Sequence, residues 1–323
     1  MILLTFVPFM LIAFVANLSE RSRRYRWVTY VLLALSNLLV LFSVLLVLLM
    51  KLAFILNERP LDLLPVEPDW GATAAILTLT GLLGFLPLLR GVRLFLARWL
   101  DIDPDSSLHA TALVFAVYLV GLTLAQLPLV GGMEGLEELE LSLGQSDLWW
   151  QALALLLMAF IGVGLGLRRN VKETAVRLGL RWPSLRAWLG VVGLVIFFEA
   201  LDYGVSAGWY ALDPAGYEHI GRISEHLFGG LLTPWGALAV GGPGCRGQAR
   251  LFRGAVQPRF GILLTSLLFA VVHIQYGLSP ATLEIFLIGL LLGWLRNRSG
   301  LVACIAVHAA YNFLNLLLAS LWP

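Results

Sequence analysis

Long uninterrupted apolar blocks dominate the chain. Val28–Met50, His109–Gly132 and Leu148–Leu167 contain no acidic or basic residue. Each block is longer than the ~18 residues at which an apolar run predicts a membrane-spanning helix and not a buried core helix. The blocks also lack the alternation of a barrel strand, so only a helix can satisfy their backbone hydrogen bonds in lipid. We therefore predict an all-α fold, a polytopic transmembrane helical bundle.

About ten apolar segments follow one another along the chain, and polar or glycine-rich stretches separate them. The stretch Met1–Asn17 has no basic residues before its apolar part, which favours a first span over a cleavable signal peptide. The predicted spans cover roughly 2–17, 28–50, 71–89, 108–131, 148–167, 188–204, 231–256, 260–277, 281–295 and 301–320.

Basic residues follow every second apolar segment. Of the 22 lysines and arginines, all but Lys51, Arg59 and Arg222 lie after the first, third, fifth or ninth segment or around the end of the seventh. Under the positive-inside rule, this pattern puts those loops in the cytoplasm and both termini outside. We expect an integral membrane protein, in a bacterial plasma membrane, whose basic loops face the cytoplasm.

Composition agrees with this interpretation. Hydrophobic residues make up 59% of the 323, charged residues 13%, and the mean hydropathy is +0.86. A soluble domain has about 25% charged residues, so this chain cannot cover a water-facing surface. The net charge of +2 indicates no nucleic-acid partner. The two cysteines, Cys245 and Cys304, are too few for a disulfide framework.

The basic loop at 168–187 divides the chain. We predict an N-terminal transmembrane helical region at 1–187, which shows no chemistry, and a second region at 188–323, which holds four of the five histidines. Polar residues inside spans are costly and usually functional. His273 follows Phe269 by four residues, and His308 and Asn312 are also four apart, which places each pair on one helix face.

The simpler alternative is that these polar groups only join helices together. That alternative is favoured for a single histidine. Two histidines and an asparagine in the last few spans favour function, and we expect them to face one shared cavity. Glu284 is the only carboxylate in the last three segments.

These residues belong to a longer pattern. Leu251-Phe252-Arg253-Gly254 precedes Gln257-Pro258-Arg259, and the pairs Phe269/His273 and His308/Asn312 follow. The pattern resembles the CAAX-protease and bacteriocin-processing (CPBP, or Abi) family of intramembrane endopeptidases. Its motifs are Glu-Glu-x-x-x-Arg, Phe-x-x-x-His and His-x-x-x-Asn or Asp, in that order near the C-terminus.

The resemblance implies a bundle of the CAAX-protease type and hydrolysis of a peptide bond in a membrane-associated substrate, either prenylated or bacteriocin-like. It implies that a glutamate of the first motif activates water, while His273, His308 and Asn312 position the water and stabilise the oxyanion. Arg253 occupies the arginine position. Zinc is the metal associated with the family, with His273 and His308 as weak candidate ligands. The chain has no His-Glu-x-x-His spacing, so we assign no metal or cofactor site.

The chain departs from the family at the first motif. Gln248 and Ala249 stand where the two glutamates belong. A glutamine cannot accept a proton near neutral pH, and an alanine has no polar side-chain atom. The preceding Gly241–Gly247 is rich in glycine and contains a proline, which makes a poor core for a spanning helix.

Three explanations remain open for this departure. The favoured one is a local reading-frame slip across about 241–250, which an unchanged read of the coding DNA would exclude. The second is a catalytically dead membrane scaffold or immunity-type protein of the same fold. The third is an enzyme that uses another carboxylate, with Glu284, Glu225, Glu218 and Glu199 as candidates. A transporter with a broken seventh helix is a more distant alternative, because no internal repeat is evident.

Overall fold

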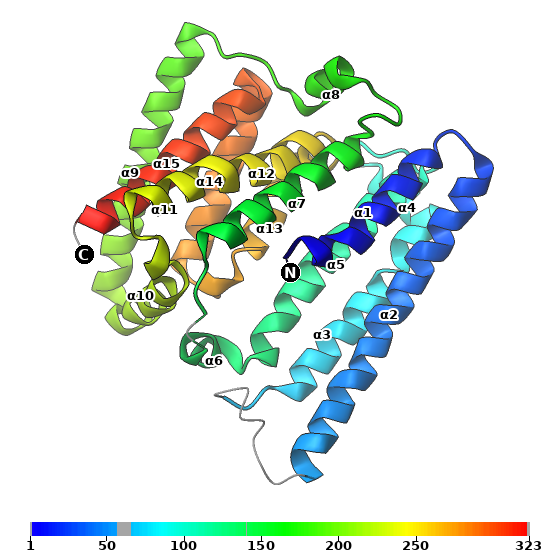
Figure 1. Ribbon diagram of the computed structural model, residues 1–323, viewed down its shortest axis with the longest axis horizontal. Helices are drawn as coiled ribbons and strands as arrows, with labels where there is room; N and C mark the ends of the chain where they lie inside the picture. Colours follow the sequence, from blue (N-terminus) through cyan, green and yellow to red (C-terminus); the bar gives the residue numbers. More distant parts are fainter. Residues whose placement is uncertain (1, 57–65, 140, 322–323) are drawn as a thin grey trace.

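Helices make up every regular element of the protein that the computed structural model describes, namely residues 2–56, 66–139 and 141–321 (Figure 1). This confirms the all-α prediction. The α-helices are α1 (Ile2–Leu18), α2 (Arg23–Leu56), α3 (Trp70–Leu83), α4 (Arg90–Leu96), α5 (Ser107–Leu129), α6 (Gly132–Glu138), α7 (Gln145–Val163), α8 (Val171–Leu178), α9 (Leu185–Leu212), α10 (Pro214–Phe228), α11 (Pro234–Ala239), α12 (Cys245–Ala249), α13 (Gln257–Val271), α14 (Pro280–Ser299) and α15 (Leu301–Leu321). Short 3-10 turns form η1 (Leu86–Leu88), η2 (Gly229–Leu231) and η5 (Ile274–Tyr276), and π-helical turns form η3 (Val240–Gly244) and η4 (Arg250–Val256).

Seven helical stretches are long and apolar enough to cross a membrane. All ten predicted segments are helical. The first, α1, is shorter than the seven stretches, and the ninth, α14, is not among them. The seventh and eighth segments together form one of the seven apolar stretches. The seven are Arg23–Leu56, Trp70–Leu88, Ser107–Leu129, Gln145–Val163, Leu185–Leu212, Pro234–Val271 and Leu301–Leu321.

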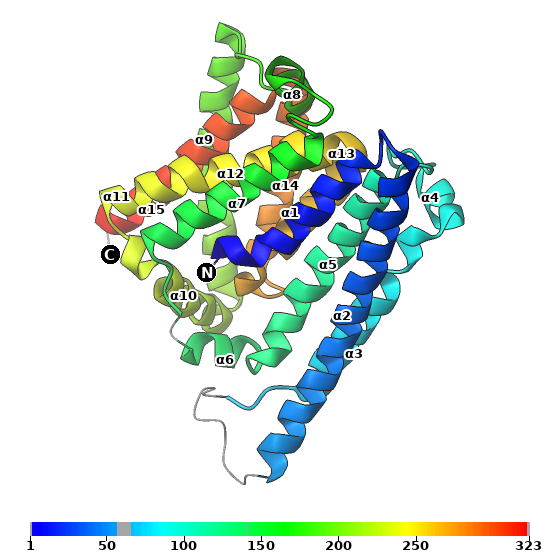
Figure 2. The same ribbon diagram turned by 45° about the vertical axis from the view of Figure 1, so that its right-hand side comes forward.

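The helices form one bundle with α2 and α3 side by side along one edge and α9 along the opposite edge (Figures 1 and 2). The stretch from α11 to η4 lies between α7 and α15 and contacts both. One hydrophobic cluster joins Leu113 of α5 to Phe252 and Phe269, and another joins Leu178 to Phe198 and Leu301. Both clusters cross the boundary predicted near 187, and the division into two regions stays a prediction.

The glycine-rich island does form a helix, contrary to the expectation of a poor spanning core. A Cβ on Gly247 would lie 2.8 Å from the carbonyl oxygen of Ala152, and a Cβ on Gly241 would lie 2.6 Å from that of Ala309. The missing side chains therefore let this helix pack closely against α7 and α15. Small residues at helix contacts are the usual means of close packing in membranes. The π-helical turns η3 and η4 flank α12 on both sides.

A kink within α13 separates the seventh segment from the eighth. Gly261 has φ 74° and ψ 177°, a backbone conformation that strains any residue with a Cβ. The eighth helix then ends at Val271, six residues before the predicted end at 277.

Loops rich in arginine meet at one end of the bundle. Arg259 pairs with Asp101 at 2.6 Å, Arg177 donates to the carbonyl of Gly254 at 3.1 Å, and Arg168 donates to Asn17 at 2.8 Å. This gathering agrees with the alternation of basic loops, although the orientation in the membrane stays a prediction. Arg59 lies outside the described residues.

Arg246 does not join this end. It is exposed within α12, twelve residues after Pro234, which is ~18 Å along the helix axis.

At the other end, α6, which carries Glu134, Glu137 and Glu138, holds α10. Glu137 of α6 pairs with Arg222 at 2.5 Å and with His219 at 2.8 Å, and its carbonyl lies 3.0 Å from Nδ1 of His226. Arg222 thus lies at the end opposite the arginine-rich loops. It is one of the three basic residues that do not follow the alternating pattern.

We expect Gly247→Ala to destabilise the protein, because the new methyl group meets a backbone atom that cannot rotate away. The cost should be about 1–3 kcal/mol, measured as a lower thermal unfolding midpoint in detergent. Gly242→Ala is the matched control, since a Cβ there meets nothing within 4 Å. Equal effects of the two substitutions would contradict the proposed packing.

We expect Glu137→Gln to loosen the contact between α6 and α10 in a pH-dependent way. The hydrogen bond from Arg222 lowers the pKa of Glu137 below its ordinary value. The stabilisation is therefore present above the unfolded pKa of about 4.3 and is lost as pH falls through the lower folded pKa. Unfolding midpoints of the wild type and Glu137→Gln should differ at neutral pH and converge in acid. Glu138→Gln, an exposed neighbour, should match the wild type at every pH.

Candidate active site

One cavity of about 1330 Å³ brings the candidate residues together. Helices from both predicted regions line it, because its wall includes Phe9, Phe115 and Leu119 as well as residues of α10, α12, α13, α14 and α15. His273, His308, Asn312, Gln248 and Glu284 all border this cavity.

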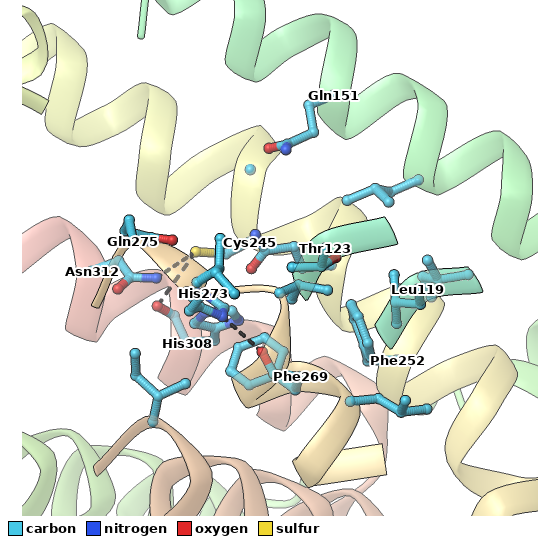
Figure 3. A pocket seen from close by; sticks show the side chains of 18 of the residues that line it. Leu119, Thr123, Gln151, Cys245, Phe252, Phe269, His273, Gln275, His308 and Asn312 are labelled. Carbon is cyan, nitrogen blue, oxygen red and sulfur yellow. Dashed lines mark hydrogen bonds between the residues drawn. The ribbon is translucent and has the colours of Figure 1, made fainter. Parts of the chain in front are cut away.

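His308 and Asn312 lie one turn apart on α15 and face the same space, as their spacing predicts (Figure 3). His308 is buried, with 7% of its surface exposed. The amide of Asn312 donates a hydrogen bond to Sγ of Cys245 at 3.0 Å, and that thiol donates to the carbonyl of His308 at 3.6 Å. Cys245 thus joins α12 to α15 at the cavity wall.

His273 lies just beyond the end of α13 and not inside the eighth span, which corrects the prediction. Its φ of −99° and ψ of 44° are not helical. Nδ1 of His273 lies 2.7 Å from the carbonyl oxygen of Phe269. A carbonyl can only accept, so Nδ1 carries the proton, and Nε2 of the neutral ring is left as an acceptor. The end of the helix thereby fixes the tautomer as well as the position of the ring.

Phe269 connects the two histidines. Its ring centroid lies 4.7 Å from that of His273 and 5.7 Å from that of His308. The guanidinium carbon of Arg253 lies 5.5 Å from the same phenyl centroid. Arg253 is buried and does not line the cavity, so it supports Phe269 from behind. Figure 3 shows Phe269 next to both imidazoles.

The two positions of the missing glutamates have different surroundings. Gln248 is half-buried and lines the cavity, whereas Ala249 packs in the hydrophobic cluster with Val195 and Leu301. Nη2 of Arg253 has no hydrogen-bond partner among the described residues. Its Nη1 donates to Gln257 at 3.4 Å and to Ser266 at 3.3 Å.

The four alternative carboxylates also differ. Glu284 is buried and lines the cavity, and Glu225 lines it but is exposed. Glu199 and Glu218 are absent from the wall of this cavity. Asp202 of α9 also lines the cavity, although the sequence analysis did not single it out.

The donor set does not fit a zinc centre. Structural and catalytic zinc sites use three or four protein ligands. Among the described residues, no three His, Cys, Asp or Glu side chains gather closely enough to hold a metal ion. The two imidazoles, His273 and His308, therefore lack a third ligand, and no step below depends on a metal.

Sequence reasoning missed Cys245, Gln275 and Gln151, which point toward the cavity in Figure 3. Cys245 precedes Gln248 by three residues, so the helical spacing of the two positions was the available signal. No comparable signal marks Gln151, which comes from α7 in the N-terminal region.

The fold and the cavity define a polytopic membrane protein with a histidine-lined internal site. Residues 221–314 match the family described as type II CAAX prenyl endopeptidase Rce1-like. The matched segment contains all three motif positions and confirms the resemblance seen in the sequence. The matched family is a protease family, and the seven apolar helices fit an integral membrane protein. No curated protein and no solved structure matches the chain.

We expect Phe269→Ala to unfold the site, because Phe269 is 4% exposed and contacts both imidazoles and Arg253. Removing a buried phenyl ring costs about 3–5 kcal/mol, which thermal unfolding in detergent would detect. Leu267→Ala on the same helix is the control, since Leu267 is 51% exposed and should change stability by less than about 0.5 kcal/mol. A stable Phe269→Ala protein would show that the ring does not hold the site together.

Proposed function

We propose that this chain is an intramembrane endopeptidase of the CAAX-protease type that hydrolyses a peptide bond of a membrane-associated substrate, prenylated or bacteriocin-like. The observation that carries the proposal is that His273, in the turn beyond α13, and His308 and Asn312, on α15, border one cavity. Polar groups that only joined helices would have no reason to leave a shared space between them.

Hydrolysis requires a placed water and donors for the oxyanion that develops on the carbonyl oxygen. Nε2 of His273 is the free acceptor of its ring, so it holds the water by accepting one O–H bond. His308 and the amide of Gln248 supply N–H groups that stabilise the oxyanion, in surroundings of low dielectric where such bonds are strong. Asn312 orients the wall through its hydrogen bond to Cys245.

The substrate enters from the bilayer in this proposal. Phe9, Phe115 and Leu119 give the cavity an apolar wall that suits a lipid-modified or hydrophobic peptide. The predicted region 1–187 then serves as part of the substrate site, and 188–323 carries the chemistry. We place the protein in a bacterial plasma membrane with the arginine-rich end in the cytoplasm, following the positive-inside rule.

A non-catalytic membrane scaffold or immunity-type protein is the second candidate. It is supported by one observation, namely that the position of the first missing glutamate faces the cavity and holds Gln248, which cannot accept the proton. Such a protein would bind the same peptides and release them uncut.

Cleavage assays on the full chain in liposomes separate the two candidates. We expect the wild type to cleave a farnesylated CAAX-terminated peptide or a bacteriocin precursor, and His308→Ala to lose this activity. The double variant Gln248→Glu/Ala249→Glu should cleave at least as fast as the wild type, because it places carboxylates at the two positions where the family pattern has them. Cleavage by the double variant alone would favour the scaffold, and cleavage by neither would refute the peptidase proposal.

A further inference from the structure

Glu284 is the only aspartate or glutamate of the described residues that is fully buried, with 5% of its surface exposed. It lies in the first turns of α14, and it borders the cavity that holds both imidazoles. No arginine, lysine or histidine of the described chain lies within ion-pair distance of it. A buried carboxyl group without a cation is costly, and such groups usually have a function.

Among the described residues, one side chain lies within hydrogen-bond distance of the carboxyl group of Glu284. The hydroxyl of Tyr311 lies 3.5 Å from its Oε1. Tyr311 follows His308 by three residues on α15, so the two side chains share a helix face and are ~4.5 Å apart along the axis. Tyr311 therefore links the carboxyl group of Glu284 to the face of α15 that carries His308, and both groups border the same cavity.

We propose that Glu284 is the catalytic proton acceptor that replaces the missing glutamate of the first motif, and that Tyr311 is the positioning residue that orients its carboxyl group. The inference rests on the proposed peptidase function and extends it, since the family pattern assigns no role to position 284.

The proposed step balances without a further reactant. The ionised carboxylate of Glu284 takes a proton from water, and the water oxygen forms a bond to the peptide carbonyl carbon. The resulting oxyanion collapses, the C–N bond breaks, and the proton passes from Glu284 to the leaving amine. The products are a carboxylic acid and an amine, and the carboxylate of Glu284 is regenerated.

Burial selects Glu284 over His273 as the proton acceptor. Apolar surroundings favour the uncharged form of any group. A carboxylate becomes neutral when it takes the proton, whereas an imidazole becomes charged. We therefore assign His273 to hold the water molecule and Glu284 to accept the proton of that water.

The remaining carboxylates suit this role less well. Glu225 is exposed, and Asp202 is half-buried with no side-chain hydrogen bond to His308, Tyr311 or Asn312 among the described residues.

The test measures kcat and KM for a farnesylated CAAX-terminated peptide with the full chain in liposomes. We expect Glu284→Gln to lower kcat by about 10²–10⁴-fold with little change in KM, the usual size of a general-base effect. Glu218→Gln is the matched control, because Glu218 is exposed, lies outside the cavity wall and should keep the wild-type rate. Tyr311→Phe should lower kcat by about tenfold, as expected when one hydrogen bond worth ~1.4 kcal/mol in the transition state is lost.

Two further variants make every outcome decisive. Glu284→Asp keeps a carboxylate and should retain a rate well above that of Glu284→Gln, whereas equal losses would indicate a structural role and overturn the inference. In the Gln248→Glu/Ala249→Glu background, Glu284→Gln should cost little, because a second base is present. A Glu284→Gln protein with the full activity of the wild type would also overturn the inference that Glu284 is the proton acceptor.

The same assays separate the inference from the function on which it rests. If the wild type is inactive and the Gln248→Glu/Ala249→Glu variant is active, Glu284 is not the proton acceptor, but the cavity is still a peptidase site. Absence of cleavage by both proteins removes the peptidase function itself.

Discussion

The buried guanidinium of Arg253 is the constraint on which the candidate site depends. A charged group inside an apolar bundle must find partners within the protein, and Arg253 finds them on Phe269, Gln257 and Ser266. Gln257 in turn donates to the carbonyl of Gly293 on α14 at 2.8 Å. This chain of contacts fixes η4, α13 and α14 relative to one another. The positions of the catalytic candidates follow from that arrangement, although Arg253 never reaches the cavity.

The helical spacing of the motifs predicted part of this site correctly, and the failures have physical causes. His308 and Asn312 face one cavity because both lie within a regular helix, where four residues make about one turn. The apolar neighbours of His273 predict that it lies inside a helix. In the structure the helix ends at Val271, and the imidazole donates a hydrogen bond to the carbonyl of Phe269. Periodicity locates apolar faces and cannot show where a helix stops inside an apolar run.

Tertiary packing decided what the local pattern could not. The glycine-rich island has low helix propensity, yet Gly241 and Gly247 allow contacts with α15 and α7 that a larger residue would prevent. The choice between Glu284 and the other carboxylates was likewise beyond the sequence, because it depends on burial and on the neighbour Tyr311. Propensity is a weak guide where helices from distant parts of the chain meet.

The exposed guanidinium of Arg246 has a consequence for the surrounding bilayer. It lies ~18 Å from the start of its helical stretch, which is about the midplane of a ~30 Å hydrocarbon layer. A cation at that depth requires headgroups and hydration to bend inward to meet it, so a bilayer around α12 would have to thin beside Arg246. The same helix carries Cys245 and Gln248 on its inner side. Such thinning would shorten the path by which water crosses from the aqueous phase to the cavity.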